Sequence, residues 1–285
     1  MRGSDRKLRL KKSLTKAPIY IFLLIACFFS LGPIYVVLAN AFKTRQQSTE
    51  NFFAPPRAFY LENLTQVVQR DGYFNYVRNT VMITACALLA LAVLLPMVSY
   101  ALARNMHRSV WYRRAYFYFI LGVFVPFQVV MIPVVKMMSQ IGLSNIPGLI
   151  LMHVVFAFSD GIFLFVAYMQ GLPIELEEAA RIDGCSVMQT YLRIVFPLAA
   201  PMLAAVLSLN CLWIWNDFLL PLLLLNKSPD SWTLQLFQYN FKTTYSFDYN
   251  QAFASVLIAT LPVAAVYLAA QRFIVSGITG GAVKG

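Results

Sequence analysis

The chain has 285 residues, of which 59% are hydrophobic, 15% aromatic and only 12% charged. A soluble domain carries about twice that share of charged residues, so apolar segments this abundant cannot all be buried inside one globule. The net charge of +11 is compatible with nucleic-acid binding, but the basic residues cluster beside apolar runs, which argues against a polar nucleic-acid-binding domain and favours a membrane protein.

Six apolar runs are long enough to cross a bilayer, which takes about 20 helical residues each. Backbone groups inside lipid have no water to bond, so every run should be helical, and the predicted fold class is an all-α integral membrane protein with six transmembrane helices. The runs lie near residues 18–42, 79–103, 115–138, 147–170, 198–225 and 253–275. They form a membrane domain of residues 18–276, between a basic tail of residues 1–17 and a C-terminal tail of residues 277–285.

The first run has some features of a secretory signal peptide, because it follows a basic start and Ala39-Asn40-Ala41 resembles a cleavage site. Its apolar stretch is too long for the hydrophobic region of a signal peptide. We therefore expect a retained membrane helix.

The distribution of lysine and arginine predicts which segments face the cytoplasm. With the amino terminus inside, the cytoplasmic segments hold 15 of the 23 basic residues, many of them in "RKLRLKK" and "RNMHRSVWYRR". Both termini are therefore expected inside, and so is the segment of residues 171–197.

Residues 171–197 read as two short helices separated by a glycine. Apolar residues recur at helical spacing from Leu172 to Ala180, and Gly184 stands where a helix ends. Ser186 and Gln189 have the spacing of a capping box, which begins a second helix that leads to Pro197. Two readings remain open on these grounds: an ordinary interfacial loop, or a docking element for another protein.

The segment "ELEEAARIDGCSVMQTYLRIVFPLAAP" (residues 175–201) resembles the EAA loop of ABC importer permeases. That pattern is E-A-A, three residues, glycine, about nine residues, isoleucine and then L/F-P. The matching positions are Glu178, Ala179, Ala180, Gly184, Ile194 and Pro197.

Two further segments resemble the carbohydrate-uptake branch of that family, the permeases similar to the smaller subunit of the maltose transporter. They are "WIWNDFLLPLLLL" (residues 213–225) and "QRFIVSGITGGAVKG" (residues 271–285). One departure from the family lies before the loop, where Val166 stands at a place that arginine often takes. A salt bridge of relatives at that place is therefore not expected here.

The resemblance implies that this chain lies in a bacterial inner membrane. There it would pair with a second homologous permease, two copies of a cytoplasmic ATPase and an extracytoplasmic sugar-binding protein. ATP and magnesium would bind to the ATPase, and no cofactor is implied for this chain. The residues that would couple to the ATPase are Glu178, Ala179, Ala180, Asp183, Gly184, Ile194 and Pro197. The tail that would reach the ATPase comprises Gly281, Ala282, Val283, Lys284 and Gly285.

The sequence offers no sign of bond chemistry. It contains no GxxxxGK[ST] phosphate loop, no HExxH and no GxSxG motif, and none of its four cysteines has CxxC spacing. We therefore expect a transporter subunit rather than an enzyme. A membrane enzyme is the more distant alternative.

Polar residues within the apolar runs are costly in lipid and need a reason. Asp160 and His153 are spaced to share a helix face, as are Asn210, Trp213 and Asp217. Asp160, Asn210, Trp213 and Asp217 are candidates for a sugar path, in which amides and carboxylates bond hydroxyls and an aromatic ring covers the apolar sugar face. The alternatives are hydrogen bonding that only holds the bundle together, a path for a non-sugar solute, or an ion-coupled transporter built on Asp160 and His153.

The two long outer segments, residues 43–78 and 226–252, are rich in aromatic and amide side chains. By resemblance the second would enter the groove of the external binding protein. Anchoring at the membrane edge explains the aromatic residues equally well.

Overall fold

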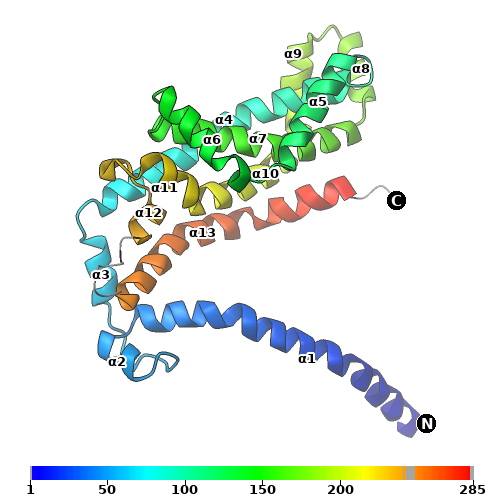
Figure 1. Ribbon diagram of the computed structural model, residues 1–285. Helices are drawn as coiled ribbons and strands as arrows, with labels where there is room; N and C mark the ends of the chain where they lie inside the picture. The colour runs from blue at the N-terminus through cyan, green and yellow to red at the C-terminus, as the bar shows by residue number, and fades with distance from the viewer. Residues whose placement is uncertain (1, 240, 242–247, 283–285) are drawn as a thin grey trace. The chain divides into compact units, whose positions relative to one another are not determined.

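The computed structural model describes residues 2–239, 241 and 248–282, and across these residues it contains helices and turns without a strand (Figure 1). The chain divides into two compact units. The first comprises Met1–Arg70 and Phe241–Ile258, and the second comprises Asp71–Asn240 and Ala259–Gly285. In the described residues five helices are long and apolar enough to cross a membrane, or six if one bent pair counts as a span.

The first unit contains α1 (Arg2–Ala41), two short helices and the first turns of α13 (Tyr249–Ala282). The short helices are α2 (Arg45–Glu50) and α3 (Glu62–Val68). From Ile19 to Leu38, most large apolar side chains of α1 are exposed, as in a helix that has lipid as its solvent.

A buried polar cluster holds the end of α1. The Asn250 amide donates to the carbonyls of Asn40 (2.9 Å) and Lys43 (3.1 Å), and the Asn63 amide donates to the Lys43 carbonyl (2.8 Å). The Lys43 side chain is only 1% exposed, and its ammonium donates to the carbonyls of Asn51 and Phe52, both at 3.1 Å. Burial lowers the pKa of the Lys43 amine.

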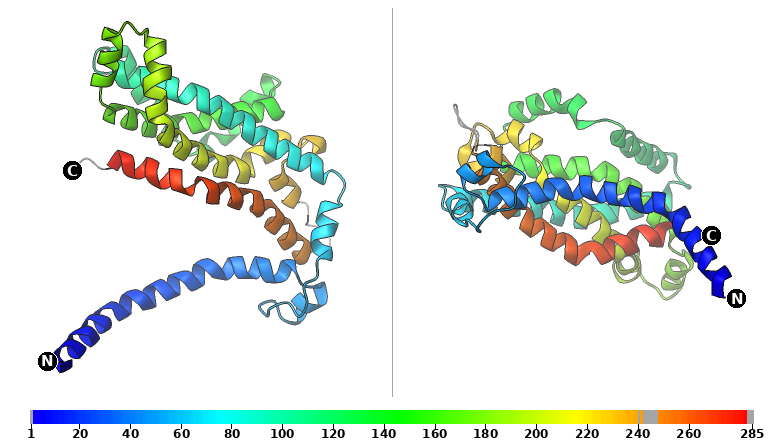
Figure 2. Two further views of the ribbon diagram at one scale, coloured as in Figure 1. Left: turned by 180° about the vertical axis from the view of Figure 1, so that it is seen from behind. Right: turned by 90° about the horizontal axis from the view of Figure 1, so that it is seen from below.

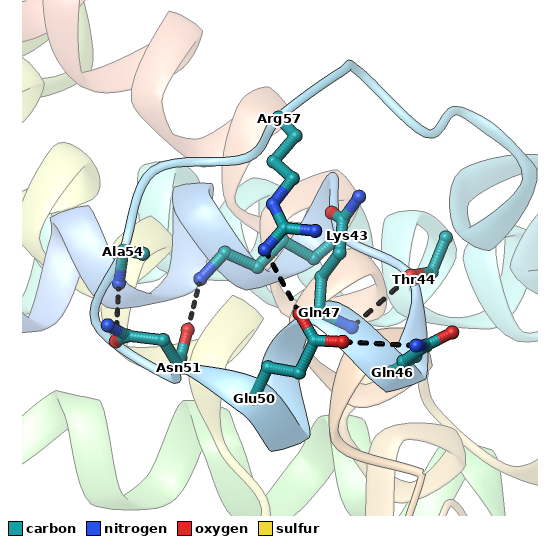
Figure 3. A network of polar contacts seen from close by, with 8 residues as sticks. All are labelled: Lys43, Thr44, Gln46, Gln47, Glu50, Asn51, Ala54 and Arg57. Atoms are coloured by element: carbon teal, nitrogen blue, oxygen red, sulfur yellow. Dashed lines mark hydrogen bonds and ion pairs between the residues drawn. The ribbon is translucent and has the colours of Figure 1, made fainter.

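Figure 3 shows the polar contacts that shape the turn around α2. The Thr44 hydroxyl caps the helix by accepting from the Gln47 amide (3.3 Å), and Arg57 reaches back to Glu50 (3.1 Å). The Asn51 side chain accepts from the Ala54 amide (3.0 Å). The Thr44 bond satisfies one of the backbone amides that the start of a helix leaves free, and the other two contacts hold the loop that follows α2.

The second unit is built on three long helices that lie side by side in Figures 1 and 2. They are α4 (Tyr73–Asn105), α7 (Ile146–Gly171) and α10 (Phe196–Asn216). Their contact surfaces share a buried apolar cluster that includes Leu95, Phe165 and Val206. A Cβ atom at Gly161 would lie 2.8 Å from the Leu95 side chain, so this glycine permits the close approach of α7 to α4.

The apolar run at 115–138 forms two helices rather than one straight span. α5 (Val110–Val123) and α6 (Phe127–Gln140) meet at 104°, and Figure 1 shows them as separate rods. Pro126 lies at the break with an extended backbone (φ −61°, ψ 136°). Proline disfavours helical geometry in the residue before it and lacks the amide that would continue the helix, which explains the bend.

The run at 198–225 is also broken, at Asp217. α10 ends there because Asp217 is extended (φ −68°, ψ 126°) and its carboxylate accepts from the Leu219 amide (3.1 Å), which starts α11 (Leu219–Leu225). At its other end α10 is continuous with α9 (Val187–Thr190) through a π-helical turn, Tyr191–Val195. The second helix that the sequence predicts up to Pro197 therefore continues through this proline into α10.

The remaining helices of the second unit are short. α8 (Glu175–Ile182) and α9 lie together at one end of the long helices (Figures 1 and 2), and α12 (Leu234–Tyr239) follows a single 3₁₀ turn, Pro229–Ser231. The later part of α13 belongs to this unit, where the Trp215 indole donates to the Ala259 carbonyl (3.1 Å).

Candidate functional site

Two places in the second unit collect the residues singled out in the sequence: the pair α8–α9 and a cavity among α5, α6, α7 and α10. In the first place, Gly184 ends α8 with a left-handed backbone (φ +81°) that side-chain-bearing residues rarely adopt. The Ser186 hydroxyl accepts from the Gln189 amide (3.3 Å), and the Gln189 side chain accepts from the Ser186 amide (2.8 Å). The capping box predicted from the sequence is therefore present.

The pair α8–α9 presents apolar side chains outward. Ile182 is 87% exposed at the end of α8, and Val187, Met188 and Leu192 are exposed on α9 and the turn that follows it. Of the residues matched to the EAA pattern, Glu178, Ala179, Gly184 and Pro197 are exposed, Ile194 is half-buried and Ala180 is buried. Asp183 is exposed as well. An apolar surface rimmed by carboxylates is typical of a protein interaction site.

Glu177, which the sequence did not single out, is the residue that fixes α8 to the bundle. It is 2% exposed, and its carboxylate accepts from the Tyr100 hydroxyl (2.8 Å) and from Arg104 Nε (2.8 Å). A second Arg104 nitrogen lies 2.7 Å from the carboxylate and also donates to the Leu172 carbonyl (3.3 Å). Tyr100 and Arg104 both belong to the last turns of α4.

The Tyr100 ring extends the same cluster to the π-helical turn. It packs on the Tyr191 ring with centroids 5.5 Å apart. The α4 end therefore contacts both arms of the helical pair, through Glu177 on α8 and through Tyr191 after α9. One signal could have indicated Glu177: it shares a helix face with Ala180, three residues on, which is the face turned toward the bundle.

The second place is a cavity of about 360 Å³ at the bend between α5 and α6. Its walls include Asp160 on α7 and Asn210 and Trp213 on α10, three of the four residues predicted for a sugar path. Ser159 adds a hydroxyl. A Cβ at Gly122 would lie 2.6 Å from the Ser159 hydroxyl oxygen, so this glycine keeps α5 close to α7 at the wall.

The fourth predicted residue, Asp217, lies behind the cavity wall and pairs with His153. Their side chains are 3.0 Å apart, and His153 is 1% exposed. The Trp213 ring packs edge-on against the imidazole with centroids 5.3 Å apart, so this pair supports the indole that lines the cavity. The sequence placed His153 with Asp160; the structure pairs it with Asp217, because the break at Asp217 turns that carboxylate toward α7.

Part of the predicted ATPase-contacting tail, residues 283–285, lies outside the described residues. Within the described part of the chain, no group of three or more histidine, cysteine or acidic side chains could hold a metal ion. The four cysteines are free thiols.

Comparison with known proteins places the chain in a family. Residues 95–280 match the family described as binding-protein-dependent transport system inner membrane component. The chain is 41% identical over 266 residues to the multiple sugar-binding transport system permease protein MsmG of Streptococcus mutans, covering 93% of this chain and 96% of that protein. It is 36% identical to the probable starch degradation products transport system permease protein AmyC of Thermoanaerobacterium thermosulfurigenes, covering 89% and 92%.

A solved structure shows the same fold. The crystal structure of a bacterial ABC transporter involved in the import of the acidic polysaccharide alginate aligns with a TM-score of 0.78 at 21% identity, covering 92% of this chain and 97% of that chain. These matches agree with the apolar helices of the structure and identify an integral protein of the bacterial inner membrane. The chain belongs to the family of binding-protein-dependent transport system inner membrane components.

Proposed function

We propose that this chain is the permease subunit of an ATP-driven importer of a carbohydrate, most readily an oligosaccharide, and forms half of its translocation path. The observation that carries the proposal is the near-complete alignment with MsmG at 41% identity, because that relative is named for multiple sugars. AmyC is named for starch degradation products, which are saccharides too. The other half of the path belongs to a second homologous permease, and an extracytoplasmic binding protein delivers the sugar.

The pair α8–α9 is the proposed docking element for one of two ATPase subunits, with both termini on the same cytoplasmic side. Its exposed apolar side chains, led by Ile182, need cover that the bundle does not supply. Glu178 and Asp183 add exposed carboxylates for polar contacts, and Ala179 lets a partner backbone approach closely. The tail of residues 281–285 is proposed as a second ATPase contact.

Two connections carry movement of the docking element into the membrane. The Glu177–Arg104 ion pair (2.7 Å) ties α8 to α4, and the π-helical turn joins α9 to α10 without an interruption. α10 supplies Asn210 and Trp213 to the cavity. Closure of the ATPase pair can therefore change the cavity only if the ATPase grips the docking element differently in its open and closed states.

The cavity is the proposed solute path of this subunit. Asn210 and Asp160 supply an amide and a carboxylate for hydroxyl groups, and the half-exposed Trp213 supplies a flat aromatic surface for the apolar face of a sugar ring. The ion-coupled alternative needs Asp160 and His153 to act together. His153 instead bonds Asp217 at 3.0 Å, which favours a supporting role behind the indole.

Site-directed cross-linking tests the docking element. A cysteine at Ile182, in a chain whose four native cysteines are replaced by alanine, should form a disulfide-linked product with the co-expressed ATPase when a cysteine lines the ATPase cleft. A cysteine at Phe59 is the matched control, because Phe59 is also a highly exposed apolar residue (75%, against 87% for Ile182) but lies in the segment expected outside. Cross-linking from Phe59 and not from Ile182 would refute the proposed docking element.

A further inference from the structure

We propose that Asp160 makes the cavity select against negatively charged solutes, so that this permease carries neutral or cationic saccharides, such as amino sugars, and excludes uronic-acid oligomers. The inference rests on the proposed function of the cavity and adds the charge class of the solute. It depends on which ionisable groups line the cavity and on whether their charges are compensated.

Asp160 is the only ionisable side chain among the fourteen described residues that line the cavity. The other polar groups are the Ser159 hydroxyl, the Asn210 amide and the Trp213 indole, which carry no charge. The cavity is therefore lined by one acidic side chain and by no basic side chain.

The Asp160 carboxylate is uncompensated within the described part of the chain, where it makes no hydrogen bond or ion pair. The other acid among the path candidates, Asp217, has two bonding partners, His153 at 3.0 Å and the Leu219 amide at 3.1 Å. Asp217 therefore behaves as a structural group, while Asp160 is exposed and free to meet a solute.

The charge is large enough to decide which solutes enter. Two like charges about 6 Å apart at an effective dielectric constant of about 20 repel enough to lower occupancy roughly a hundredfold. A neutral sugar instead donates hydroxyl hydrogen bonds to the carboxylate, and hydrogen bonds to an ionised acceptor are the stronger kind. An ammonium group on an amino sugar gains both the bond and the opposite charge.

The alginate importer shows that the fold itself does not set this preference. Its structure aligns with this chain at a TM-score of 0.78, and its described solute is an acidic polysaccharide. The fold therefore does not by itself exclude acidic solutes, and the cavity of this chain can reject them only through its side chains, such as Asp160.

The test measures the charge of the cavity directly, in the complete transporter reconstituted into liposomes. A single cysteine replaces Leu209, a half-exposed cavity residue, in a chain without native cysteines. Two methanethiosulfonate reagents, one with a trimethylammonium group and one with a sulfonate group, react with it. The ratio of the cation rate to the anion rate, divided by the ratio for a free thiol, reports the local charge.

We expect the normalised ratio of the cation rate to the anion rate to fall at least tenfold in Asp160→Asn and to stay at its original value in Asp160→Glu. Asp71→Asn is the matched control, because Asp71 is an exposed acid just before α4 that does not line the cavity, and it should leave the ratio unchanged. A ratio that Asp160→Asn does not alter would overturn the charge selection and leave the permease function standing. A cysteine at 209 that neither reagent reaches would overturn the cavity as a solute path, and the charge selection with it.

Discussion

Replacing Glu177 with glutamine removes the charge that balances Arg104 at the joint between α8 and α4 while keeping the size of the side chain. Breaking a buried ion pair by neutralising one partner costs about 3–5 kcal/mol, because the other charge is left without a counter-ion. Arg104 keeps 13% of its side chain exposed and retains the Leu172 carbonyl as an acceptor at 3.3 Å. The expected loss in the local stability of the joint is therefore lower, about 2–3 kcal/mol.

Hydrogen exchange of the α8 backbone amides measures this loss in the assembled transporter. A change of about 2–3 kcal/mol in local opening corresponds to roughly 30- to 150-fold faster exchange. Glu175→Gln is the matched control, because this glutamate of α8 is exposed, is not among the residues proposed to couple to the ATPase, and should change exchange by less than about threefold when neutralised. In the same protein, sugar uptake per ATP hydrolysed should fall for Glu177→Gln, since the docking element no longer moves with α4.

The double variant Glu177→Gln with Arg104→Gln separates charge balance from packing. Replacing both members of a buried pair by neutral groups costs less than neutralising one, so exchange in α8 should slow again relative to Glu177→Gln alone. If Glu177→Gln exchanges at the original rate, or if the two substitutions add without interaction, the ion pair does not hold α8 on α4.

Three further substitutions have defined outcomes. Gly184→Ala should cost about 1 kcal/mol of stability in the α8–α9 pair and lower transport coupling, because position 184 needs φ +81°, although a Cβ there meets nothing within 4 Å. Gly184→Asn should cost less, since asparagine adopts this conformation more readily than alanine. Equal rates of hydrogen exchange in the two variants would contradict this. Trp213→Ala should reduce uptake by tenfold or so while the amount of assembled complex stays constant, and an unchanged uptake rate would leave Trp213 a packing residue. Burial lowers the pKa of the Lys43 amine in the folded chain, so the unfolded chain binds the proton of this amine more tightly. The free energy of unfolding should therefore rise as pH increases toward 10.5, the ordinary pKa of lysine. Lys43→Met should remove this contribution to the slope in unfolding measurements made at alkaline pH below 10.5.

Local signals in the sequence predicted the features that depend on a few neighbouring residues. The capping box at Ser186 and the glycine stop at Gly184 follow from the chemistry of adjacent backbone groups, and both occur in the structure. Membrane-spanning helices follow from the length of an apolar run, although length alone does not reveal a bend. The break at Pro126 divides one run into α5 and α6 because the proline effect outweighs the apolar pattern.

Pairings between distant segments lay beyond local signals. Glu177 bonds Arg104, which is 73 residues earlier in the chain, and His153 bonds Asp217, which is 64 residues later. Helix periodicity shows which face a residue occupies but not which helix packs against that face. The sequence predicted three of the residues that line the cavity, because Asn210 and Trp213 share a face of α10 and this face turns toward Asp160.

The central claim is that a separate ATPase, gripping the α8–α9 pair, drives solute through this permease. The most direct measurement is saccharide uptake into liposomes that contain this chain, its partner permease and the binding protein, with or without the ATPase. The account predicts uptake only when the ATPase and internal ATP are both present, and none when a proton or sodium gradient is applied without them. Uptake driven by an ion gradient in liposomes lacking the ATPase would contradict it.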